Sequence, residues 1–162
     1  MRQVIYAMRF MGQAEPVGDV GNVLKATTSA PSSTLSSTVG PDGLTGTIAS
    51  VPGGEATFAS EVTFTGETSF LEIGSIGFGE GHVLQFSTVG SGYLGPSADP
   101  SRKQGAVTWR VEGGEGQFAD ASGLITSNFF VDEGLGVVDH HFGVLLMSAS
   151  EGQSGEEAHE QA

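Results

Sequence analysis

The chain has 162 residues and no cysteine, and its formal net charge at pH 7 is −13. Its length fits one domain with a sizeable core, and the lack of cysteine excludes disulfides, thiol nucleophiles and cysteine metal sites. The acidic balance disfavours nucleic acids and anionic membranes as partners, because both need a basic surface.

The sequence also bears on the location of the protein. No stretch approaches 18 consecutive apolar residues, which excludes a transmembrane helix. Residues 1–16 carry an arginine inside their apolar run and show no signal-peptide cleavage pattern. A cytoplasmic location is therefore expected.

Glycine marks the boundaries of the predicted elements. It occurs 26 times, roughly twice the usual ~7 %, and it falls between short runs rich in Val, Ile, Phe and Thr, as in many-stranded β-proteins. Helical periodicity is hard to find. The predicted strands, in chain order, are residues 4–11, 23–28, 33–39, 46–51, 56–64, 68–76, 82–89, 105–112, 124–131 and 136–147.

Three segments differ in composition from the predicted strands. Residues 26–38 hold nine serines and threonines and are interpreted as a polar strand with loop flanks. Residues 95–104 contain two prolines and are predicted to form a long surface loop, as a lid or rim beside a cavity. Residues 148–162 contain four glutamates and no lysine or arginine, which predicts a disordered acidic tail after a β-domain of residues 1–147.

About seven to nine strands in one domain leave a sandwich or a closed barrel as the main architectures. The first and last strands are apolar on both faces, so their outer faces need a cover. Subunit contacts would supply it, and a homo-oligomer, dimer or trimer, is therefore expected.

The stretch "VEGGEGQFADASGLI", residues 111–125, decides between candidate folds. A phosphate-binding loop would need a following helix and usually a lysine, but this run has three acidic residues, no lysine and a β-rich sequence after it. Read as sheet, it is a strand, a tight turn at Gly113 and Gly114, a bend at Gly116, a core residue at Phe118 and a further strand.

This pattern resembles the strand–GGxGxF–xxAxG–strand signature of the allene oxide cyclase and dirigent-type β-barrels. The resemblance covers about fifteen residues directly. It implies an all-β fold with a single antiparallel barrel of about eight strands, often trimeric, whose apolar cavity binds a lipid-like or polyketide-like molecule. It also implies that the glycine-rich element is structural and carries no chemistry.

Candidate catalytic residues are polar side chains that could face such a cavity among aromatics. Glu72 is preferred over Glu61 and Glu67, because a carboxyl inside an apolar barrel has a raised pKa and can transfer protons; on the outside it would be a solvated charge. His82 and His141 are candidate acid–base groups, or else histidines bonded at a strand end or subunit contact. Asn128 could hold an oxyanion or a strand-end backbone group.

Apolar and polar residues on the same strands are candidates for substrate binding. Trp109 is interpreted as a cavity wall or core plug, and Arg9 as the partner of an internal carboxylate or of an anionic substrate group. The full set of substrate-binding candidates is Tyr6, Arg9, Phe70, Phe86, Trp109 and Phe130.

Three functions stay open. The first is a cyclase, isomerase or lyase that acts on an apolar small molecule with no metal and no cofactor. The second is a dirigent-like or other non-catalytic protein that binds such a ligand, and the third is a structural oligomer with a filled interior. Adjacent His140 and His141 point to opposite faces of a regular strand, which argues against a metal site there.

Overall fold

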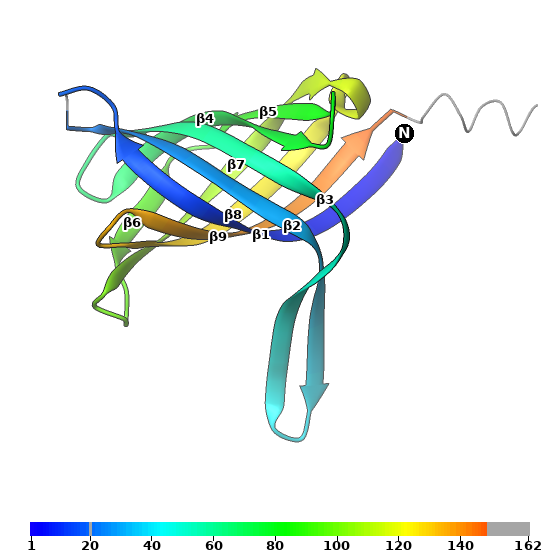
Figure 1. The fold of residues 1–162 in the computed structure, drawn as a ribbon, viewed down its shortest axis with the longest axis horizontal. Coiled ribbons are helices and arrows are strands. Elements are labelled where there is room, and N and C mark those ends of the chain that lie inside the picture. The colour runs from blue at the N-terminus through cyan, green and yellow to red at the C-terminus, as the bar shows by residue number, and fades with distance from the viewer. Residues whose placement is uncertain (20, 149–162) are drawn as a thin grey trace, which may run out of the picture.

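The computed structural model describes residues 1–19 and 21–148 as an all-β fold in one antiparallel sheet (Figure 1). The predicted acidic tail lies, apart from Ser148, outside the described residues. The strands are β1 Arg2–Pro16, β2 Val23–Gly40, β3 Gly43–Phe64, β4 Ser69–Phe78, β5 Val83–Thr88, β6 Gly92–Pro96, β7 Arg102–Glu115, β8 Ser122–Asp132 and β9 Gly136–Met147, with a short 3₁₀ helix at Gly116–Phe118.

Eight of these strands close into a ring. The order is β3-β2-β1-β9-β8-β7-β5-β4, and β4 returns to pair with β3 along Ala56–Phe64. The short strand β6 pairs with both β4 and β7 at one end of the ring. The expectation of an antiparallel arrangement of about eight strands is therefore confirmed at the level of an eight-stranded ring.

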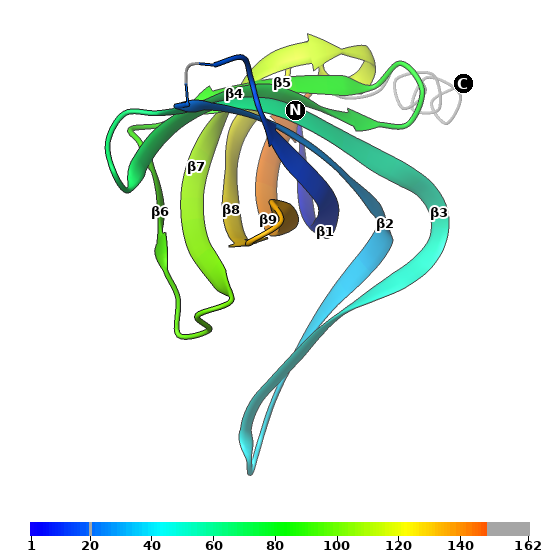
Figure 2. The same ribbon diagram turned by 60° about the vertical axis from the view of Figure 1, so that its left-hand side comes forward.

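Strands β2 and β3 are longer than expected and leave the ring together. The four short strands predicted within residues 23–64 are two continuous strands, because the Ser/Thr-rich segment pairs without interruption by a loop. The pairing shifts register between Pro31 and Ser33, and from there the two strands run as a ribbon to the turn between Gly40 and Gly43. Figures 1 and 2 show this ribbon projecting away from the ring; residues 32–54 are called the arm below.

Alternate residues of each strand face the interior, as a period of two requires. On β3 the buried side chains are Ala56, Phe58 and Ser60. The centre of the interior is an aromatic layer around Phe58, whose ring lies 5.4–6.0 Å from four other rings. Those four rings belong to Phe10, Phe86, Trp109 and His141.

The glycine-rich stretch differs from expectation at one point. Gly113 and Gly114 lie inside β7, where the pairing with β5 shifts register, so they form a bulge and not a tight turn. Their φ angles are 76° and 155°, and a Cβ at Gly114 would collide with the Val83 carbonyl oxygen. The turn itself follows at Gly116–Phe118, and Phe118 is buried as predicted.

Candidate functional site

One end of the ring holds a cavity of about 670 Å³ above the aromatic layer. A volume of this size falls within the ~300–1,000 Å³ typical of small-molecule pockets. Most of its wall is apolar, and the wall is built from inward-facing residues of β2, β3, β4, β8 and β9. The larger apolar contributors are Leu24, Val62, Phe64, Phe70, Phe129, Val131 and Val137.

Glu72 of β4 brings a carboxyl group to this apolar cavity. Its Oε2 accepts a hydrogen bond from Ser60 Oγ at 2.6 Å, and its Oε1 accepts one from Trp109 Nε1 at 3.2 Å. The pKa of Glu72 is raised to about 8, chiefly because burial disfavours the charged form; the charge of Asp139 adds to this, whereas the two hydrogen bonds lower the pKa. Glu72 is thus mainly a neutral acid at pH 7.

Asp139 of β9 is a second buried carboxyl group on the cavity wall. Ser127 Oγ donates to its Oδ1 at 2.6 Å, and His141 Nε2 lies 2.9 Å from its Oδ2. The His141 ring stacks on Phe10 with 4.3 Å between centroids, which fixes its plane, and its Nδ1 has no partner among the described residues. One cavity is therefore faced by two buried carboxyl groups, each bonded to a serine, and the exposed Asp132 and Glu133 also line it.

Thr28 of β2 adds a hydroxyl to the same wall. The residue is 4 % exposed, and its Oγ1 has no hydrogen-bond partner within the described part of the chain. An unpaired buried hydroxyl carries a free-energy cost of about 1–3 kcal/mol. A polar atom of a bound molecule would remove that cost.

The segment between β6 and β7 forms the rim of the cavity. Pro96, Ser97, Pro100, Ser101 and Arg102 all line it, so the prediction of a rim is confirmed, although the loop is shorter than residues 95–104 because β6 and β7 take both ends.

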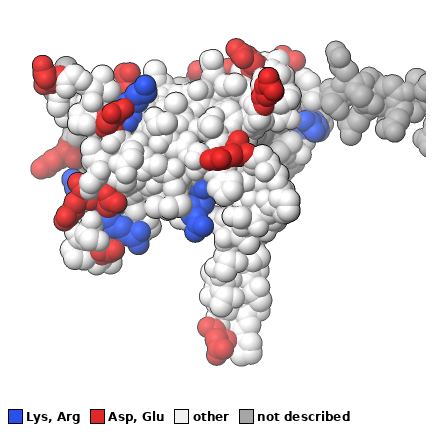
Figure 3. All heavy atoms as spheres, in the orientation of Figure 1, with Lys and Arg blue, Asp and Glu red and all other residues white. Residues whose placement is uncertain are grey.

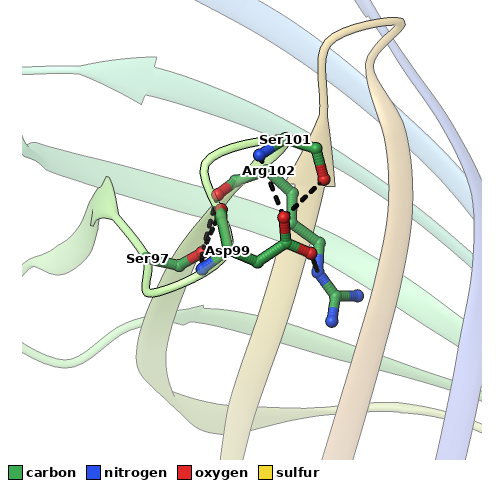
Figure 4. A network of polar contacts seen from close by, with 4 residues as sticks. All are labelled: Ser97, Asp99, Ser101 and Arg102. Carbon is green, nitrogen blue, oxygen red and sulfur yellow. Dashed lines mark hydrogen bonds and ion pairs between the residues drawn. The ribbon is translucent and has the colours of Figure 1, made fainter.

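A network centred on Asp99 holds this rim (Figure 4). Asp99 Oδ1 accepts bonds from the Ser101 amide at 3.0 Å and hydroxyl at 2.6 Å, and Oδ2 accepts one from Arg102 Nε at 3.1 Å. The hydrogen bonds from Ser101, more than the charge of Arg102, lower the pKa of Asp99. The Arg102 guanidinium also lies over the Phe130 ring at 3.9 Å.

Five of the sequence-predicted site residues meet at or under the cavity. Glu72 and Phe70 line it directly. Phe86, Trp109 and His141 belong to the aromatic layer that forms its floor, and Trp109 and His141 hold the two carboxyl groups.

The other five do not reach the cavity. Tyr6 points into the interior at the opposite end, beside Phe78, where burial raises the pKa of its phenol. His82 is exposed and accepts a hydrogen bond from the Gln117 amide at its Nδ1. Arg9, Asn128 and Phe130 lie on the outer face of the ring and are not among the residues that line this cavity.

Four polar groups of the site were missed by the sequence analysis as candidates, namely Thr28, Ser60, Ser127 and Asp139. The signal for Ser60 and Asp139 is present, because each shares a strand face with apolar residues that the structure buries. The signal for Ser127 is weak, since its face of β8 has three apolar residues of four and the opposite face has two. Thr28 lies in a run of hydroxyl residues in which no single member stands out.

Within residues 1–19 and 21–148, no three His, Asp or Glu side chains gather into a group that could hold a metal ion. No helix among them has the length and hydrophobicity to cross a membrane. Comparison with family models, with curated proteins and with solved structures found no match to this chain.

Proposed function

We propose that this protein is a cofactor-independent enzyme of the isomerase, cyclase or lyase kind, which acts on an apolar small molecule held in the cavity of the ring. The observation that carries the proposal is the pair of carboxyl groups on one apolar wall. Glu72 is held neutral by burial, and Asp139 is the acceptor of bonds from Ser127 and His141. Two carboxyl groups with different environments are a common basis for acid and base roles in one site.

In this proposal Glu72 donates a proton to a polar atom of the bound molecule, such as a carbonyl oxygen that gains negative charge. Trp109 and Ser60 keep the carboxyl group oriented, and the apolar wall excludes water. Asp139 accepts the proton that the bound molecule loses from carbon, so that the molecule gains one proton and loses one, and Thr28 Oγ1 positions the ligand. Restraint of a flexible apolar chain in a shaped cavity favours ring closure.

A second function is favoured by a different observation: both oxygens of Glu72 are already engaged by Ser60 and Trp109. If the carboxyl group only completes the aromatic layer, the chain is a non-catalytic ligand-binding protein. The resemblance of residues 111–125 to the allene oxide cyclase and dirigent-type barrels is compatible with both functions, because that group contains cyclases and binding proteins.

One experiment separates the two functions. Native mass spectrometry of the protein purified without added ligand identifies a retained molecule by its mass. That molecule is then incubated in D₂O with wild type, Glu72→Gln and the exposed control Glu61→Gln. We expect wild type and Glu61→Gln to incorporate deuterium into the ligand or to convert it, and Glu72→Gln to bind it without change.

Binding by all three proteins with no exchange or conversion would establish the binding function instead. The absence of a retained molecule is resolved by titration with the uncharged fluorophore N-phenyl-1-naphthylamine. If wild type also fails to bind this probe, both proposed functions are wrong.

A further inference from the structure

The arm is a surface with two unlike faces. Cross-strand partners lie on the same face of a ribbon, so Leu35 pairs with Ile48 and Val39 pairs with Leu44 on one face. The opposite face carries the pairs Ser36–Thr47 and Thr38–Thr45. Val39 is 83 % exposed and Leu44 is 72 % exposed, so the apolar face is uncovered in the single chain.

The arm is also nearly free of charge. Asp42 is the one charged residue from Ser32 to Gly54, in a chain with 25 charged residues of which 19 are acidic. Figure 3 shows the projecting ribbon as almost entirely uncharged, with acidic atoms near its tip. A two-stranded ribbon alone is at best marginally stable in water and needs a third layer or strand. A second molecule packed on the apolar face of the arm would supply that layer.

The ring has an uncovered apolar surface beside the root of the arm. On the outer faces of β1, β9 and β8, Ile5 lies opposite Val144, and Val144 lies opposite Leu124. Their exposed fractions are 59 %, 36 % and 52 %, and the neighbouring Phe142 is 47 % exposed. These residues, together with Met11 and Leu146, are called the outer wall.

The backbone next to the outer wall is also unpaired. One edge of β1 pairs with β9 along Arg2–Gln13. The other edge pairs with β2 only from Met11 to Pro16, so along Arg2–Phe10 this second edge pairs with no described strand. One side-chain contact bridges the gap, from Ser33 Oγ to the Ala7 carbonyl oxygen at 3.2 Å. An open strand edge is a template for contact with another chain. A groove lined by Ile5, Ala7, Leu35 and Phe142 runs between this edge and the arm.

The two surfaces fit each other in length and charge. The arm pairs from Ser33 to Gly40 and so spans roughly 25 Å at ~3.3 Å per residue. The outer wall along β9, from Val138 to Leu146, has roughly the same length. The outer faces of β1 from Gln3 to Gln13, of β8 from Ser122 to Phe130 and of β9 carry Arg9 and no acidic residue, and Glu15 and Asp132 lie beyond these stretches at the far ends of β1 and β8. The arm carries Asp42 and no basic residue.

We propose that the arm of one protein chain packs its apolar face against the outer wall and open β1 edge of a second copy. The protein is then a homo-oligomer whose subunits are held together by these arm contacts. In a symmetric pair each chain contributes both its arm face and its outer wall, so the same two surfaces are covered on both sides. The inference is independent of the chemistry proposed for the cavity.

The test is the oligomeric state of the full chain, by analytical ultracentrifugation between 1 and 100 µM. The variant Val39→Lys with Leu44→Glu makes the apolar face polar while its opposite charges keep the cross-strand pair favourable. Its matched control, Thr38→Lys with Thr45→Glu, places the same charges on the other face. We expect a defined oligomer for wild type and control, and an association at least ~100-fold weaker for the apolar-face variant.

Two results would overturn the proposal: a monomeric wild type at 100 µM, or an oligomer that the apolar-face variant leaves intact. Circular dichroism shows whether each variant keeps its β-structure. An acceptor-side variant, Ile5→Lys, supplies a second measurement, since it alters the outer wall and leaves the arm unchanged. We expect it to weaken association as well, and unchanged association would overturn the assignment of the wall.

Discussion

At the scale of single residues, Glu72 marks the boundary between a filled layer and an open cavity. Trp109 Nε1 reaches its Oε1 from the aromatic layer, and Ser60 Oγ reaches its Oε2 from the neighbouring strand. These contacts hold the carboxyl group in place without surrounding it by charge. Burial therefore dominates its titration.

The pH dependence of stability tests this environment. The pKa of Glu72 is raised from 4.5 to about 8 in the folded protein, so between these values the folded state holds one proton that the unfolded state releases. Stability due to this group is fully present below pH 4.5 and is lost as the pH rises to 8. We expect urea unfolding to show a loss approaching ~1.4 kcal/mol per pH unit across this range.

The variant Glu72→Gln removes this titration and keeps the shape of the neutral acid. We expect its free energy of unfolding to change less with pH than that of wild type. The difference in slope should be about 1.4 kcal/mol per pH unit, which is the contribution of one bound proton. Glu61→Gln, on the exposed face of β3, is expected to behave as wild type. Equal slopes for wild type and Glu72→Gln would show that Glu72 is ionised in the folded protein.

The sequence of β8 does not determine which of its two faces points into the ring. In "LITSNFFV" one face carries Leu124, Thr126, Asn128 and Phe130, and the other carries Ile125, Ser127, Phe129 and Val131. The two faces differ by a single apolar residue, three of four against two of four, and a one-residue choice exchanges them. The structure settles the choice through β9, because Ser127 lies opposite His141 and Phe129 lies opposite Asp139. On β4, Phe70, Glu72 and Ile76 share the face that the structure buries, and these apolar neighbours were the reason to prefer Glu72.

At the scale of elements, the bulge in β7 lets the chain pass from a long strand into the 3₁₀ turn. Gly114 is required there for two reasons: its φ of 155° is disfavoured for other residues, and a Cβ would meet the Val83 backbone. We expect Gly114→Ala to lower the free energy of unfolding by about 2 kcal/mol or more in urea denaturation.

Gly54→Ala is the matched control for this bulge, since a Cβ at Gly54 meets nothing within 4 Å and its φ is not positive. We expect a change within about 0.5 kcal/mol there. If Gly114→Ala were as mild as the control, the register shift between β5 and β7 would not depend on glycine.

The hydrogen bonds of Asp99 are expected to stabilise the rim loop without affecting the stability of the whole fold. Hydrogen bonds from Ser101 lower the pKa of Asp99 from its ordinary value of 3.8, so the network is present above that value and is lost as the pH falls through the lowered pKa. We expect Asp99→Ala to speed hydrogen exchange of the Ser101 amide by at least ~10-fold at neutral pH while Tm stays unchanged. An unchanged exchange rate would show that the prolines alone hold the rim.

The existence of most elements follows from the sequence, but their extent does not. Alternation and glycine spacing locate strands in nearly every part of the ring. They do not show that residues 26–38 continue past Pro31 as one strand of the arm, because pairing with β3 and not burial holds that part. The short β6 was missed for a related reason: within a proline-containing run, only its neighbours β4 and β7 make it a strand.

At the scale of the whole molecule, the interior is divided into a packed half and an open half. Large rings fill the layer around Phe58, whereas the cavity wall contains small residues such as Ala14 and Ala26. A sequence optimised for stability alone would fill this space, since buried voids cost packing energy. The open half is therefore the part of the molecule that stability does not explain.

Filling the cavity should separate stability from binding. Ala26 lines the cavity and lies opposite Ser60 across β2 and β3. We expect Ala26→Leu to keep the free energy of unfolding equal to that of wild type or raise it by up to about 1 kcal/mol, because its side chain enters existing space. Binding of N-phenyl-1-naphthylamine, followed by fluorescence, should weaken by at least ~10-fold. Ala59→Leu, on the exposed face of β3, should leave binding unchanged.

A destabilised Ala26→Leu would instead show that the space is already occupied by side chains, and unchanged probe binding would place the ligand outside the ring.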